Sequence, residues 1–171
     1  MDFYMKLPRN KKEHALFMAI ISIISVNIIA PVITMMEMGF CLDVYKDALH
    51  TVPLIWPVVI LLVLLTEKPA GKLTFKIVRE EDSFNAVILT NILCCVLMMS
   101  VVLTIVGTWI GMRQISMAPI YGFIRNWPRN FAVSFAVESL IAQPIARYAM
   151  LKFHLVADKS LPRFSHAEMD F

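Results

Sequence analysis

The segment from Asn126 to His154 reads NWPRNFAVSFAVESLIAQPIARYAMLKFH. It is apolar from Phe131 to Ile145 except at Ser134, Glu138, Ser139, Gln143 and Pro144. Arg129 and Arg147 flank this apolar part, as cationic anchors flank a membrane span at its two water boundaries. Glu138 lies midway between the two arginines, at the depth where a carboxylate is most costly in a bilayer. The segment therefore predicts a membrane-spanning helix with an acidic residue near its centre.

The composition of the whole chain also indicates a membrane protein. Its 171 residues are 58% hydrophobic and 17% charged, with a mean hydropathy of +0.69. A soluble domain of this size could not bury so much apolar surface. The net charge of +3 is small and scattered, so we expect no nucleic-acid partner. Three cysteines, two of them adjacent, are no basis for a disulfide framework.

Three further uncharged runs predict additional helices, at residues 15–36, 52–66 and 86–112. The first and third are long enough to cross a hydrocarbon core of about 30 Å. The second is only about 22 Å long as a helix. It either spans with help from snorkelling lysines or local bilayer thinning, or forms a re-entrant or interfacial segment. We expect helices near 15–38, 51–76, 84–112 and 128–154.

The distribution of basic residues predicts the orientation of these helices. Of the 16 lysines and arginines, 12 lie in the two terminal segments and the central link, and 4 lie in the other two loops. Basic residues stay preferentially on the cytoplasmic side, so we expect both termini and the central link to be cytoplasmic, in a multi-pass protein of the inner (cell) membrane. Trp56, Trp109 and Trp127 then lie near the outer interface, where tryptophan is enriched.

The two halves of the chain share short motifs at the expected helix boundaries. Trp-Pro opens the second and fourth helices, and Pro followed three residues later by a basic residue closes them: Trp56, Pro57, Pro69 and Lys72, then Trp127, Pro128, Pro144 and Arg147. We predict an all-α membrane protein, a four-helix bundle of two parallel two-helix repeats. The repeats cover 1–82 and 83–155, and a cytoplasmic tail covers 156–171.

These motifs, with the sequence PRNKKE at 8–13 and Met-Gly-Phe at 38–40, resemble a bacterial family of small integral membrane proteins that contain domain of unknown function 2798. The family unit is one helical hairpin, so the resemblance implies a tandem pair that covers nearly the whole chain. The second unit is the closer match. The first has a shorter helix and Lys68 at the position of Gln143. The family implies a fold and a location, and brings no established catalytic residues.

Four polar side chains fall inside the predicted spans: Glu138, Asn27, Asn91 and Gln143. Asn27 lies near the depth of Glu138, so the two could pair. One interpretation is that these groups form hydrogen bonds between helices and fix their packing, each contributing about 0.6–2 kcal/mol. The other is that Glu138 takes up and releases protons in a transport cycle.

Sulfur-containing residues also suggest one metal hypothesis. Cys94 with Met98 and Cys95 with Met99 are spaced one helical turn apart, and Met35, Met36 and Met38 cluster farther along the first helix. Copper(I) favours such ligands, although the two groups lie at different depths and methionine is a common packing residue. We therefore favour packing and assign no metal site and no cofactor.

The chain contains no Gly-rich phosphate loop and no nucleophile elbow, so nothing in it indicates an enzyme. We expect a non-enzymatic structural or partner-binding component of the membrane. The alternative is a small proton-coupled transporter that uses Glu138. Its partners would be the lipid bilayer and either a second copy of the chain or another membrane protein.

Overall fold

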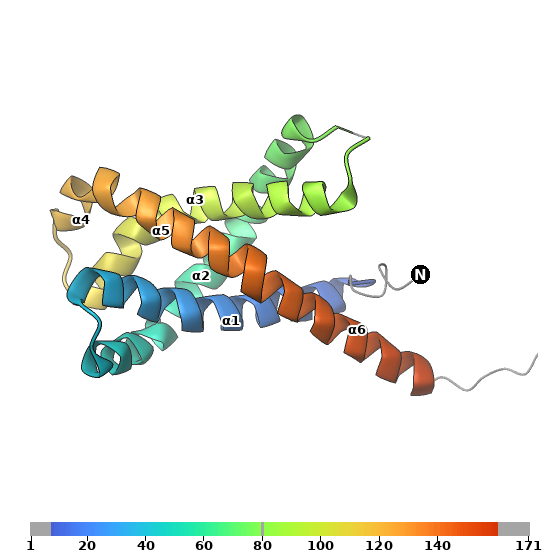
Figure 1. Ribbon diagram of the computed structural model, residues 1–171, viewed down its shortest axis with the longest axis horizontal. Helices are drawn as coiled ribbons and strands as arrows, with labels where there is room; N and C mark the ends of the chain where they lie inside the picture. Colours follow the sequence, from blue (N-terminus) through green and yellow to red (C-terminus); the bar gives the residue numbers. More distant parts are fainter. Residues whose placement is uncertain (1–7, 80, 161–171) are drawn as a thin grey trace, which may run out of the picture.

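The computed structural model describes residues 8–79 and 81–160, and in these ranges all regular structure is helical. Figure 1 shows the order of the elements: α1 (Lys11–Met38), α2 (Leu42–Ile77), α3 (Phe84–Met112), the short α4 (Ala118–Tyr121), α5 (Phe123–Val137), the π-helical turn η2 (Glu138–Ala142) and α6 (Gln143–Ser160). The last three follow one another without a break. We call them together the C-terminal rod.

Three of the helices are long and apolar enough to cross a membrane: α1, α2 and α3 from Asn85 onward. Many of their large apolar side chains face outward, and Leu64, for example, is 64% exposed. Such a surface suits lipid, so the three helices indicate a multi-pass membrane protein. The C-terminal rod is not among these candidate spans, because η2 divides it, α5 has only 15 residues, and the sequence of α6 contains Arg147, Lys152, Asp158 and Lys159.

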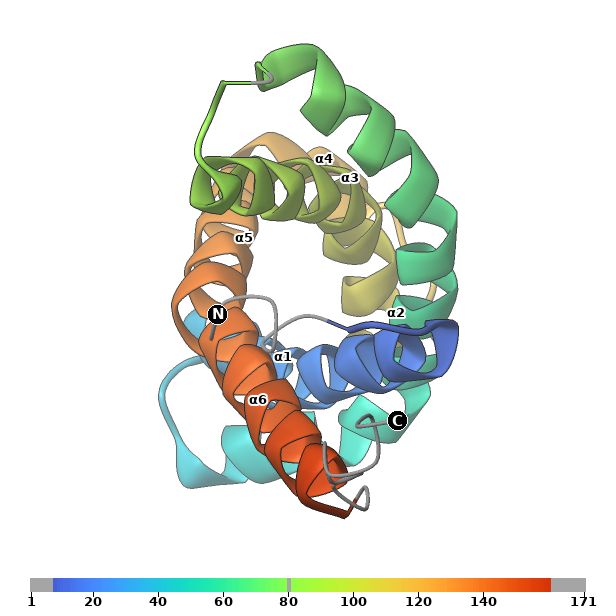
Figure 2. The ribbon, with the colours of Figure 1, turned by 90° about the vertical axis from the view of Figure 1, so that its right-hand side faces the viewer.

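The long helices pack as a ring of antiparallel neighbours. α1 packs against α2, α2 against α3, α3 against α5, and α1 also contacts all three parts of the C-terminal rod. Figure 2 shows this arrangement from one end. The loop at 39–41 and α4 lie at one end of the molecule, called here the α4 end. Residues 8–10, the turn between α2 and α3 and the last residues of α6 lie toward the other, called the α6 end (Figure 1).

Helix α2 differs from the sequence-based prediction. It begins at Leu42, so most of the expected polar connection before residue 51 is helical. Gly39, with φ of 105°, ends α1 in a conformation that suits glycine, and the chain enters α2 after only three residues. With 36 residues, α2 is about 54 Å long as a straight helix. It is not too short to span.

The prolines of the predicted boundary motifs lie inside helices rather than at helix ends. Pro57 and Pro69 lie inside α2, Pro128 lies inside α5, and Pro144 lies at the start of α6 in the middle of the C-terminal rod. None of these prolines ends a helix. The prediction that they mark helix ends was wrong because helices packed in a membrane tolerate proline in their interiors.

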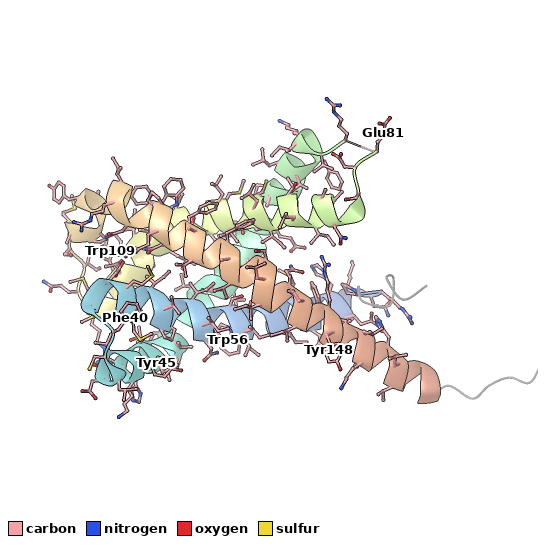
Figure 3. All side chains as sticks on the ribbon, in the orientation of Figure 1. Phe40, Tyr45, Trp56, Glu81, Trp109 and Tyr148 are labelled. Carbon is pink, nitrogen blue, oxygen red and sulfur yellow. The ribbon has the colours of Figure 1, made fainter. Side chains whose placement is uncertain are left out.

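Helix α3 covers the residues predicted for the third helix, and Ser83 caps it by accepting a hydrogen bond from the Ala86 N–H. Helix α6 continues to Ser160, whereas the tail was expected to begin at residue 156. The rest of that predicted tail, 161–171, lies outside the described residues. Figure 3 shows Phe40, Tyr45 and Trp109 toward the α4 end and Glu81 toward the α6 end.

Candidate functional site

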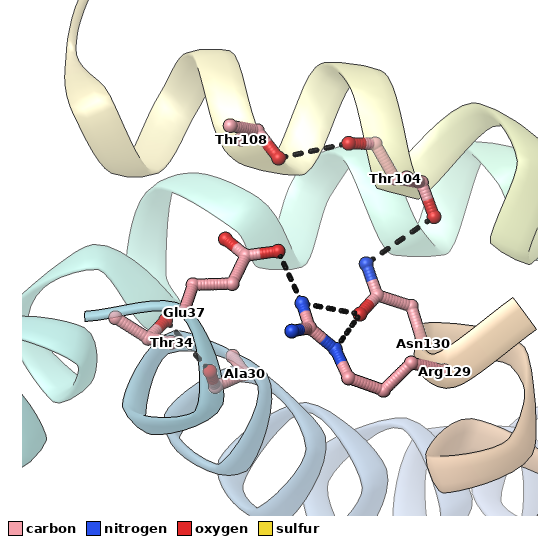
Figure 4. A network of polar contacts seen from close by, with 7 residues as sticks. All are labelled: Ala30, Thr34, Glu37, Thr104, Thr108, Arg129 and Asn130. Atoms are coloured by element: carbon pink, nitrogen blue, oxygen red, sulfur yellow. Dashed lines mark hydrogen bonds and ion pairs between the residues drawn. The ribbon is translucent and has the colours of Figure 1, made fainter. Parts of the chain in front are cut away.

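A polar network ties α5 to α1 and α3 at the α4 end. The Arg129 guanidinium donates to Glu37 Oε1 at 2.9 Å and to Asn130 Oδ1 at 3.3 and 3.4 Å. Asn130 Nδ2 in turn donates to Thr104 Oγ1 at 3.4 Å. Figure 4 shows these contacts, which link three helices through a single pair of adjacent side chains. Asn130 is only 4% exposed, so its hydrogen bonds lie in the protein interior.

Beside this network lies a cleft of about 450 Å³ lined by α1, α3, α4 and α5. We call it the α4-end cleft. Its polar lining comes from Glu37, Thr108, Arg125, Asn126 and Arg129. Gly122 also lines the cleft, and a Cβ at that position would lie 3.2 Å from Asn126 Nδ2, so a larger residue there would make the Asn126 side chain shift. The cleft combines two cations with one carboxylate, and that carboxylate already binds Arg129.

Aromatic residues form a row along α5. Phe123, Trp127, Phe131 and Phe135 follow one another at helical spacing, with successive ring centroids 5.8, 6.1 and 6.1 Å apart. Trp127 Nε1 also donates to Ser100 Oγ on α3 at 3.0 Å. Trp127 therefore anchors α5 to α3 through a hydrogen bond as well as through its apolar surface.

Two histidine–glutamate contacts join helices at the α6 end. His14 Nε2 on α1 lies 3.0 Å from Glu67 Oε1 on α2. On the other side of α1, His154 Nε2 on α6 lies 3.0 Å from Glu13 Oε2. The consecutive residues Glu13 and His14 of α1 therefore contact two different neighbouring helices. Of the two histidines, His154 is the buried one, with the whole residue 1% exposed.

Glu138 is the first residue of η2. In this turn the backbone N–H of Gln143 donates to the carbonyl of Glu138, five residues earlier. Pro144 gives the reason, because it has no N–H to donate to the carbonyl of Leu140 and its ring crowds that carbonyl. The wider turn relieves both problems. Such turns are rare in helices and occur frequently at functional sites.

The neighbour of Glu138 on α1 is Ser25, not Asn27. Ser25 is 4% exposed and faces Glu138, yet within the described residues its hydroxyl completes no hydrogen bond of good geometry. Asn27 is exposed and donates to the carbonyl of Ile23 on its own helix at 2.7 Å. The predicted pairing of Asn27 with Glu138 was wrong, because similar depth does not place two residues on the same face of a helix.

Asn91 is also exposed and makes a local contact, accepting a hydrogen bond from Cys95 Sγ at 3.3 Å. Neither it nor Asn27 joins two helices through a hydrogen bond in the described residues. Cys94 is buried and Cys41 exposed. Across 8–79 and 81–160, no three His, Cys, Asp or Glu side chains lie close enough to hold a metal ion.

Gln143, Pro144 and Arg147 line a second cleft, of about 210 Å³, between the C-terminal rod and the first half of α3. We call it the α3–α6 cleft. The corresponding motif residues of the first half are not gathered in this way. Trp56, Pro57, Pro69 and Lys72 are exposed along α2, and Pro128 is exposed on α5.

Sequence reasoning missed the helix–helix contacts made by Glu37, Thr104 and Asn130. Asn130 follows an arginine that was identified as a membrane anchor, which is a weak signal for a polar cluster. The partners of Asn130 depend on which helices pack against α5 at that level. The packing order of the helices could not be predicted from one sequence. The all-helical fold and its three candidate spans suggest a multi-pass membrane protein. No family model, curated protein or solved structure matches the chain.

Proposed function

We propose that the chain is a non-enzymatic, four-span protein of the bacterial inner membrane with a structural or partner-binding role. The observation that carries this proposal is the use of its interior polar side chains. Arg129, Asn130 and Trp127 hold α5 against α1 and α3, and two histidine–glutamate contacts hold α1 against α2 and α6. These groups are spread over both ends of the ring and do not converge on one reacting point.

The fourth span of this proposal is the C-terminal rod. Support comes from its continuity over residues 123–160 and from its place in the ring beside α1 and α3. A rod that packs along two candidate spans shares their surroundings. Glu138, Gln143 and Arg147 make it the most polar of the four, and the first two face neighbouring helices or a cleft rather than only lipid. Tandem repeats and membership of the family named above remain part of the proposal.

The proposed sidedness places the α6 end in the cytoplasm. That end brings together the start of α1, the turn between α2 and α3 and the end of α6, which lie in the chain's most basic regions. The α4 end, with its arginine network and its cleft, then faces the outer side.

A second candidate function is proton-coupled transport through Glu138, favoured by one observation. Glu138 begins a π-helical turn in the middle of the C-terminal rod, and the group that faces it from α1 is the buried hydroxyl of Ser25. Among the described residues Glu138 forms no ion pair. A carboxyl group kept inside a membrane without a cationic partner is a candidate proton carrier.

Reconstitution separates the two functions. Purified protein in vesicles with an imposed pH gradient should, under the structural proposal, pass protons no faster than empty vesicles. A pH-sensitive dye inside the vesicles measures the rate. Glu138→Gln keeps the shape of the side chain and removes its titration, so it is the matched variant. A wild-type flux that Glu138→Gln abolishes without lowering thermal stability would overturn the structural proposal and establish transport.

A further inference from the structure

The α3–α6 cleft contains an arginine, Arg147, that has no counterion among the described residues. Arg147 is partly buried, and its Nε is fully enclosed with no hydrogen-bond partner. Guanidinium groups stay protonated in proteins, so the charge cannot be removed by loss of a proton. In the described part of the chain Arg147 makes no ion pair, and no carboxylate lines the cleft.

Comparison with Arg129 shows that, among the described residues, the lack of a counterion is specific to one of the two flanking arginines. The two arginines flank the same apolar segment, and Arg129 is paired with Glu37 at 2.9 Å. Within the described residues, the chain therefore supplies a carboxylate to Arg129 and none to Arg147. The Arg147 Nε–H is enclosed without an acceptor, and a buried donor left unsatisfied is costly, so an external anion that accepts from it would be stabilising.

The rest of the cleft suits an oxyanion. Gln143 and Asn85 line it, and each has an amide group that can donate two hydrogen bonds. The guanidinium plane matches the oxygen geometry of a phosphate. Asn85 is in the first turn of α3, whose N-terminal end carries a partial positive charge. These three features favour a negative group near Arg147.

The apolar lining indicates where that anion comes from. Ile88, Leu89 and Ile92 form the α3 side of the cleft, and Leu89 is 49% exposed on the surface of a candidate span. The cleft therefore adjoins the surface that contacts lipid. A phospholipid offers both parts, a phosphate for Arg147 and acyl chains for the isoleucines and leucine.

We propose that the α3–α6 cleft binds the phosphate group of an anionic phospholipid and that Arg147 is its main ligand. The Arg147, Gln143 and Pro144 motif then has a common role. Pro144 imposes η2, and residues within and after that turn, Ser139, Gln143, Pro144 and Arg147, line one cleft. This inference relies on the chain lying in a membrane. It does not depend on whether Glu138 carries protons.

The test measures lipid binding to the full chain in detergent by native mass spectrometry. Phosphatidylglycerol and phosphatidylcholine are titrated separately into the wild type, Arg147→Gln and Lys152→Gln. Lys152 is the matched control, an exposed cation on the same helix that does not line the cleft. The wild type and Lys152→Gln should bind phosphatidylglycerol about tenfold more tightly than Arg147→Gln, as the loss of one buried charged hydrogen bond implies.

Two further arms complete the experiment. Ile88→Trp fills the cleft while keeping the arginine and should give the same loss, which covers the case in which Arg147→Gln fails to fold. Inorganic phosphate, titrated in place of lipid, should show no binding that depends on Arg147. If phosphate binds with that dependence, the anion is a free solute and the lipid proposal fails. Equal losses in Arg147→Gln and Lys152→Gln, or no preference for phosphatidylglycerol in the wild type, would also overturn it.

Discussion

His14 and His154 make contacts of equal length in very different surroundings. Each Nε2 lies 3.0 Å from a glutamate oxygen, but the side chains of His14 and Glu67 are both 47% exposed whereas that of His154 is 2% exposed. Water competes for the first contact and is excluded from the second. Burial therefore decides which of the two holds the helices together.

This difference gives a prediction for a pair of variants. His154→Ala should lower the thermal midpoint in detergent by about 4 °C or more, because it removes a buried ring and leaves a void. His14→Ala should change it by about 2 °C or less, because an exposed contact contributes little. Equal shifts for the two variants would contradict the argument from burial.

The contact between Arg129 and Glu37 allows a measurement of coupling between α5 and α1. Their side chains are 30% and 25% exposed, so we expect a coupling energy of about 0.5–1 kcal/mol. A double-mutant cycle with Arg129→Gln and Glu37→Gln measures it through unfolding in detergent. Arg125, one turn away, has no ion pair in the described residues and gives the control cycle. A coupling no larger than that of the control would mean that the pair does not join the helices.

At the residue scale, the sequence predicts a position along a helix but not the direction of a side chain. Counting from charged boundaries predicts that Asn27, Asn91 and Glu138 lie inside spans. Their partners depend on the helix face on which each side chain lies, and this requires the rotation of each helix in the ring. Ser25 faces Glu138 and Asn27 does not, although the two are close in sequence. Side chains two positions apart in a helix are rotated by about 200° and so point in nearly opposite directions.

Among the elements, η2 is the feature with the clearest local cause. Pro144 withdraws one N–H from the helix and crowds the carbonyl of Leu140, and the chain responds with a wider turn. We expect Pro144→Ala to restore a donor and to stabilise the C-terminal rod, by up to about 3 kcal/mol. Hydrogen exchange of the backbone amides in residues 138–144 would measure this stabilisation. Exchange should be slower in the variant than in the wild type. The same substitution at Pro69, which has no π-helical turn, is the control. Unchanged exchange would show that another contact imposes the turn.

Uncharged runs predicted the existence of the long helices well, because the cost of placing charge in lipid marks the span itself. They predicted helix ends less well. Leu42 to His50 contains acidic and basic residues and was read as a connection, yet it continues into α2. A helix can extend beyond the hydrocarbon core into water, where charges are no obstacle, so hydropathy cannot locate its end.

The arrangement of the whole molecule gives a test of sidedness. Cys41 is exposed at the α4 end, in the short link between α1 and α2. With Cys94 and Cys95 replaced by alanine, a membrane-impermeant maleimide should label Cys41 in intact cells. In the same background, Cys41→Ala combined with Glu81→Cys moves the thiol to the α6 end, where labelling should require permeabilised cells. The reverse pattern would place the α6 end outside and invert the proposed topology.

In the ring of antiparallel helices, each long helix already has a helical neighbour on both flanks. A second copy of the chain could therefore dock only on outward surfaces that lipid tails otherwise solvate. Leucine gains little free energy by exchanging an acyl chain for another leucine, so dimerisation there would depend on shape and on polar contacts rather than on apolar area. Self-association of this protein should consequently respond to the composition of the surrounding membrane.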